Sequence, residues 1–254
     1  MSLKTTSSQD NTEPVPQIIS GQDVLLLLLV VVAGVLFAIN LMPLWLPGMT
    51  FSVTGSEPKI FWFLARGSAI AAYWLLWLSV CMGVGITNKM VQTWPGVPPA
   101  YEIHQYTSLL GLGFALFHGL ILMGDHYMNF SLAQVLVPFA SQDYKPIWVG
   151  FGQIAFYAWA VVVLSFYVKK RTGKKTWRMI HYIGFACFMA VMAHGIMSGT
   201  DTSTTWAHYL YWISGASVLF LVVYRITIKM IPVESRAAKR EPTSSTSITR
   251  TEQS

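Results

Sequence analysis

Long runs of hydrophobic residues recur along the chain, separated by shorter polar stretches. A run of about 20 apolar residues is long enough to cross the hydrocarbon core of a bilayer as a helix. Six such segments are predicted, at about residues 24–46, 60–86, 101–124, 147–168, 177–198 and 206–228. The pattern therefore predicts an all-α integral membrane protein, built as a bundle of six transmembrane helices.

The polar segments divide the chain into a membrane domain and two tails. Residues 1–20 are rich in Ser, Thr, Gln and Pro, and residues 231–254 are polar throughout, so both are expected to be disordered. Residues 21–230 form the six-helix domain. Between the third and fourth segments, FSLAQVLVPFA is apolar but too short to span, which predicts a short surface or re-entrant segment.

Composition supports the membrane assignment and gives an orientation. Hydrophobic residues make up 54% of the chain and charged ones only 11%, against roughly 25% charged in soluble domains. The net charge of +6 would suit a nucleic-acid-binding protein, but 14 of the 17 Lys and Arg residues fall on one side of a six-helix bundle. That side is expected to be cytoplasmic. We therefore expect both termini in the cytoplasm and no nucleic-acid partner. The basic loop at 169–178 can also bind anionic membrane lipid.

Four histidines lie inside two of the predicted helices. His104 and His118 are 14 residues apart on the third, and His181 and His194 are 13 apart on the fifth. Both helices run outward, so His104 pairs in depth with His181, and His118 with His194. At about 1.5 Å per residue the two levels are roughly 20 Å apart. Intramembrane histidines are functional candidates, and haem iron takes axial imidazoles, so the sequence predicts two haem b groups with these four iron ligands.

The spacing on the fifth helix raises a geometric problem. Fourteen residues return to within roughly 40° of the starting face of a helix, whereas thirteen land about 140° away. A π-bulge or comparable distortion between His181 and His194 is therefore predicted, because one extra residue in a turn removes most of the mismatch.

Arg66 lies one to two turns into the second helix, at the depth of the outer histidine pair. An arginine there can snorkel to the surface. It can also bind a haem propionate, since guanidinium groups bind carboxylates bidentately, and this is the interpretation favoured here.

The patterns H-x13-H and H-x12-H on the third and fifth helices, with RGSAIAAYWLLWLSVCMGV on the second, resemble the ferric reductase-like transmembrane domain family. The resemblance covers residues 60–228. It implies a six-helix cytochrome b module of the kind in NADPH oxidases and ferric reductases, which passes electrons across the membrane. No Gly-rich dinucleotide motif follows the last helix, so the chain is similar to stand-alone bacterial haem subunits. This resemblance implies a location in a bacterial plasma membrane. A separate donor, a flavoprotein or quinol, and an outer acceptor are then expected.

Two other functions are open at this point. A transporter would use intramembrane histidines to bind a divalent metal or relay protons, and it predicts ligands clustered at one depth with carboxylates among them. The protein could also be a membrane scaffold that binds no cofactor and catalyses no reaction. The equal depths of the four histidines would then be a coincidence. The electron-transfer interpretation implies an oxidoreductase subunit, and the sequence identifies no catalytic side chain beyond the haem ligands.

Overall fold

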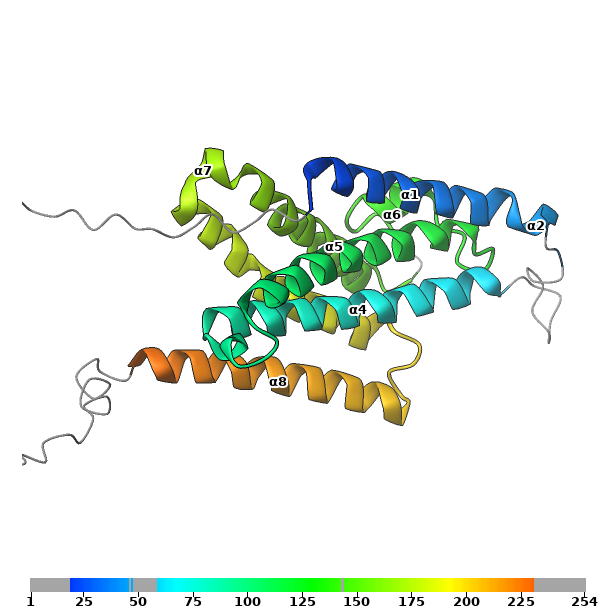
Figure 1. Cartoon of the computed structure of the whole chain (residues 1–254). Coiled ribbons are helices and arrows are strands. Elements are labelled where there is room, and N and C mark those ends of the chain that lie inside the picture. Colours follow the sequence, from blue (N-terminus) through cyan, green and yellow to red (C-terminus); the bar gives the residue numbers. More distant parts are fainter. Residues whose placement is uncertain (1–18, 46, 48–58, 143, 231–254) are drawn as a thin grey trace, which may run out of the picture.

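The computed structural model describes residues 19–45, 47, 59–142 and 144–230, and all regular secondary structure in this part of the chain is helical. Five helices are long and apolar enough to cross a membrane. They are α1 (Gly21–Asn40), α4 (Ile60–Thr87), α5 (Val97–Ile121), α7 (Pro146–Ser198) and α8 (Thr205–Met230) (Figure 1). Short helices α2 (Met42–Trp45), η1 (Met90–Gln92), η2 (Leu122–Gly124) and α6 (Leu132–Leu136) lie between them. The prediction of an all-helical chain is confirmed for these residues.

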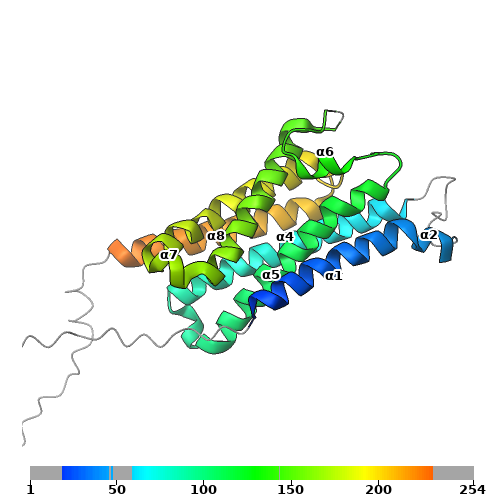
Figure 2. The same ribbon diagram turned by 90° about the horizontal axis from the view of Figure 1, so that it is seen from above.

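The longest helix, α7, has 53 residues and contains the predicted fourth and fifth segments. Its backbone leaves helical geometry at Gly173, where φ is 82° and ψ is 158°, and this kink divides it into two arms. The arms run antiparallel, because the carbonyl of Trp148 in the first contacts His194 in the second, and that of Ala155 contacts Cys187 (Figures 1 and 2). The residues on either side of Gly173 were predicted to form a polar loop. They are helical instead, since Lys and Arg are good helix formers and Gly173 alone makes the turn.

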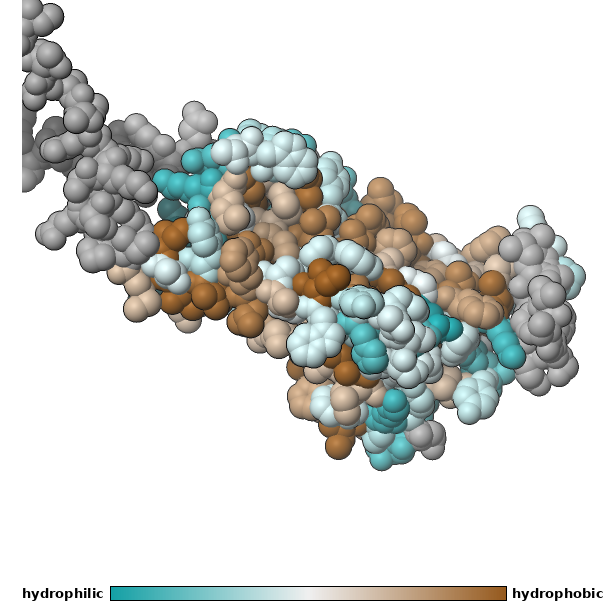
Figure 3. Space-filling model, turned by 90° about the horizontal axis from the view of Figure 1, so that it is seen from below, coloured by the Kyte–Doolittle hydropathy of each residue, from teal (hydrophilic) through white to brown (hydrophobic). Residues whose placement is uncertain are grey.

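The bundle is organised around α4 and α5, which pack along most of their lengths. Helix α1 lies against α5, while α7 and α8 cover the other side of α4 and α5 (Figure 2). The central core joins α4, α5, both arms of α7 and α8 through the buried side chains Tyr73, Leu76, Leu112, Ala155, Trp159, Cys187, Phe188 and Val218. Large apolar side chains also cover the outside, as in Leu25 (59% exposed) and Trp212 (76% exposed). In Figure 3 hydrophobic residues are spread over much of the face among residues of intermediate hydropathy, and hydrophilic ones gather at one end and in the lower part of the view.

Local signals move several helix ends from their predicted positions. Helix α1 begins at Gly21, because Ser20 and Asp23 form a capping box, and it ends at Asn40, before Pro43. Helix α5 begins at Val97, four residues before the predicted start, because prolines are tolerated in a first helical turn. The predicted short segment appears as α6, with its own capping box. The predicted tails, apart from Ile19 and Ser20, lie outside the described residues, as does most of the segment that joins the first two predicted helices.

Candidate functional site

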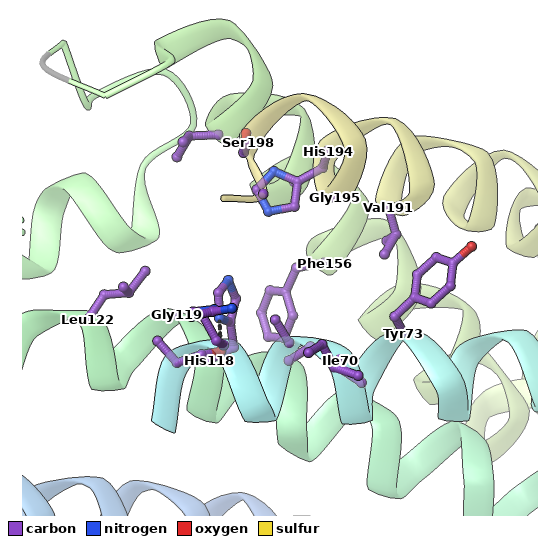
Figure 4. A pocket seen from close by; sticks show the side chains of 18 of the residues that line it. Ile70, Tyr73, His118, Gly119, Leu122, Phe156, Val191, His194, Gly195 and Ser198 are labelled. Atoms are coloured by element: carbon purple, nitrogen blue, oxygen red, sulfur yellow. Dashed lines mark hydrogen bonds between the residues drawn. The ribbon is translucent and has the colours of Figure 1, made fainter. Parts of the chain in front are cut away.

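The four helix-borne histidines form two facing pairs. The ring centroids of His104 and His181 are 5.8 Å apart, and those of His118 and His194 are 6.5 Å apart. In both pairs the planes are steeply inclined, by 71° and 68°. Figure 4 shows His118 of α5 and His194 of α7 pointing toward each other across a cavity. The structure thus brings together the same partners that equal depth in the membrane predicts.

Three of the four imidazoles are fixed by a backbone carbonyl. The Nδ1 atoms lie 2.9 Å from the oxygen of Ser79 for His104, 2.8 Å from that of Ala65 for His118, and 2.8 Å from that of Trp148 for His194. A carbonyl oxygen only accepts hydrogen bonds, so Nδ1 is the protonated nitrogen of each neutral ring, and the lone pair is on Nε2. Metal-binding histidines are held in this way, by a hydrogen bond from the nitrogen that faces away from the metal.

His181 is held differently from the other three. Its ring nitrogens have no hydrogen-bond partner among the described residues. Instead the ring stacks on Trp177, one turn earlier in the same helix, with centroids 5.0 Å apart and planes inclined by 28°. The inner pair therefore joins one imidazole fixed by a carbonyl to one fixed by an aromatic ring.

Glycines leave the space that two of the rings occupy. A Cβ atom on Gly152 would lie 2.6 Å from Nδ1 of His194, and one on Gly83 would lie 3.2 Å from Cε1 of His104. Gly152 follows Trp148 by one helical turn, so this face of the first arm of α7 offers both the carbonyl and the gap beside it. The sequence prediction did not single out either glycine, because a glycine in an apolar helix has many other uses.

The predicted π-bulge in the second histidine helix is absent. Residues 174–198 are continuous α-helix, and the only non-helical backbone within α7 is at Gly173. The side chains absorb the rotational mismatch. His194 turns toward the carbonyl of Trp148 on the neighbouring arm, whereas His181 lies back along its own helix on Trp177. The prediction was wrong because it assumed that both imidazoles leave the helix in the same direction.

The cavity beside the outer pair has a volume of about 480 Å³ and lies among α4, α5, α7 and α8. Ile70, Tyr73, Phe156 and Val191 line it together with the two histidines (Figure 4). Its size and apolar walls are those of a site for a small organic ligand. The two imidazoles face each other across it, so they define where a ligand would be held.

Arg66 lies at the wall of this cavity, at the depth predicted for it, but its partner is a protein carboxylate. Its Nε donates to Oδ2 of Asp201 at 2.9 Å, and a terminal nitrogen pairs with Oδ1. The guanidinium also lies 4.1 Å from the ring centroid of Trp62. No local signal in the sequence links Arg66 to Asp201, because the two residues are 135 positions apart. The remaining two histidines, His126 and His208, are exposed and lie outside both pairs.

Within the described part of the chain, no three His, Cys, Asp or Glu side chains gather into a site for a bare metal ion. Comparisons with protein-family models, with curated proteins and with solved structures found no match for this chain. What the site can bind is therefore inferred from its own residues. At the outer pair, two Nε2 lone pairs on rings that are each held through Nδ1 form a donor set suited to a metal with two open axial positions, and haem iron is such a metal.

Proposed function

We propose that this protein is a b-type cytochrome that carries electrons across a membrane through two haem b groups, each bound by two histidines. The carrying observation is the two pairs of facing imidazoles, in which three of the four rings have Nδ1 hydrogen-bonded to a backbone carbonyl. His118 and His194 would ligate the outer iron, and His104 and His181 the inner one. When bound, haem supplies reversible one-electron chemistry, while the protein supplies ligands, burial and charge.

The spacing of the rings supports this ligand role. Imidazole nitrogens bind first-row transition metals at about 2 Å, so two rings on opposite sides of one ion have centres about 6 Å apart. The observed separations are 5.8 Å and 6.5 Å. The apolar cavity at the outer pair supports a hydrophobic cofactor there, and the residues present fit the group.

The proposal includes six membrane crossings, with the two arms of α7 as separate spans joined at Gly173. The basic residues on both sides of that kink then lie in the cytoplasm with both termini, in a bacterial plasma membrane. Electrons would enter from a separate donor, a flavoprotein or quinol, and leave to an outer acceptor. In this scheme the protein is the electron-transfer subunit of a ferric reductase-like oxidoreductase.

Haem content tests the proposal directly. Protein purified from haem-replete cells should contain two haems per chain by pyridine haemochrome assay and show low-spin b-type bands after reduction with dithionite. His118→Ala and His194→Ala should each remove the same haem, and His104→Ala and His181→Ala the other. The exposed His126 and His208 serve as matched controls, and their alanine variants should keep both haems. A colourless wild-type protein would refute the proposal.

A further inference from the structure

Trp177 has a contact that none of the other tryptophans makes among the described residues: its ring stacks on a site histidine. The residue lies four positions before His181, so the two side chains share one face of α7. This contact replaces the carbonyl bond that orients each of the other three imidazoles. A ligand without such support would be free to rotate about its side-chain bonds, which weakens metal binding.

Trp177 is itself held from the other arm of α7. The ammonium of Lys169 lies 4.1 Å from the centroid of the indole ring, within cation–π distance, and reaches it across the turn at Gly173. The indole nitrogen is buried and has no hydrogen-bond partner among the described residues. The polar contacts of the indole are therefore those of its ring face, with Lys169 and His181.

We infer that Trp177 is the positioning residue for the inner histidine pair, and that Lys169 holds it in place. The order of contacts is Lys169, Trp177, His181 and then His104, whose ring centroid is 5.8 Å from that of His181. The cofactor in this inference is the haem of the proposed function. The contacts of Trp177 with Lys169 and His181 do not depend on that proposal. It gives Lys169 a role beyond membrane orientation, and it makes the inner site depend on the turn of α7.

The test uses the full-length protein and compares Trp177→Leu, which removes the aromatic face, with Trp177→Phe, which retains it. Low-spin ferric haem gives an electron paramagnetic resonance spectrum that reports the relative orientation of the two imidazole planes. Trp177→Leu should shift the signal that His181→Ala abolishes, leave the outer signal unchanged, and weaken retention of the inner haem by about 10-fold or more. Trp177→Phe should behave as wild type. Lys169→Gln should change the inner signal in the same direction but less.

Matched controls are Trp212→Leu, which removes a tryptophan that is 76% exposed, and Lys170→Gln, which removes the neighbouring exposed lysine. Neither should alter the inner signal. Unchanged inner signal and haem retention in Trp177→Leu would overturn the inference, as would equal effects of Leu and Phe. If the wild type binds no haem, the proposed function fails. The inference is then decided by the ring-proton chemical shifts of His181 in histidine-labelled protein. Trp177→Leu should move them farther than Trp177→Phe, which retains an aromatic ring, and equal movement in the two variants, or none in either, would overturn it.

Discussion

The imidazole of His194 has a glycine as its neighbour on the first arm of α7. Replacing Gly152 with alanine would place a methyl carbon 2.6 Å from Nδ1, where the hydrogen bond to Trp148 now forms. The ring would have to move and give up that bond, at a cost of about 1–3 kcal/mol for a buried polar group left unpaired. We expect Gly152→Ala to lower the occupancy of the outer haem and to leave the inner haem in place, as measured by haemochrome assay and reduced spectra.

Gly184 supplies the control for this prediction. It lies in the second arm of α7, and a methyl group added there would meet no heavy atom within 4 Å, so Gly184→Ala should keep both haems. Equal haem loss in the two variants would show that the effect comes from α7 as a whole rather than from the contact with His194.

The pairing of Arg66 with Asp201 sets the charge at the wall of the outer cavity. As a pair the two residues are neutral, so removing either leaves one charge. Asp201→Asn should raise the reduction potential of the outer haem, because an unpaired positive charge favours the added electron, and Arg66→Ala should lower it. A unit charge roughly 10 Å away at an effective dielectric of about 20 contributes on the order of 1–2 kcal/mol, or several tens of millivolts for one electron.

Redox titration with the two haems resolved measures this effect. The double variant Arg66→Ala with Asp201→Ala should return the outer potential close to wild type, which separates the charge effect from a loss of packing. If the outer reduction potential shifted in the same direction in Arg66→Ala and Asp201→Asn, the charge effect proposed for this pair would be contradicted.

At the scale of helices, Gly173 is the position on which α7 depends most. Its φ of 82° and ψ of 158° lie where residues with a Cβ are strained. Gly173→Ala should therefore destabilise the protein by about 1–3 kcal/mol, seen as a lower midpoint of thermal unfolding in detergent. Gly67→Ala is the control, because Gly67 is within α4 and its added methyl would meet no heavy atom within 4 Å. An unchanged midpoint in Gly173→Ala would mean that the turn can form in another way.

The position of each histidine along its helix could be predicted from the sequence, but the direction in which its side chain points could not. Depth follows from residue count and the constant rise of a helix, so His104 and His181 meet, as do His118 and His194. Direction depends on side-chain rotamers and on neighbours such as Trp148 and Trp177, which no periodicity shows. Several glycines near the histidines serve close packing instead. Gly111 leaves room for Trp159, and Gly195 for the hydroxyl of Tyr211.

At the scale of the whole molecule, the proposed topology places the Gly173 turn and the α6 region on opposite sides of the membrane. Single cysteines at Thr172 and Gln142, both exposed, test this with a membrane-impermeant maleimide on intact cells. The Gln142→Cys protein should react, and the Thr172→Cys protein should react only after permeabilisation. The parent chain, with only Cys81 and Cys187, gives the background. Labelling of the Thr172→Cys protein in intact cells would show that the protein has the opposite orientation in the membrane.

The carbonyls that hold three of the imidazoles belong to the backbones of α4 and α7, which are among the least deformable parts of a protein. In the proposed cytochrome, ligands fixed to such supports would keep their positions whether the iron is ferric or ferrous. Little nuclear rearrangement would then accompany each transfer, so the reorganisation energy would be small and electron exchange between the two sites would be fast even at a small driving force.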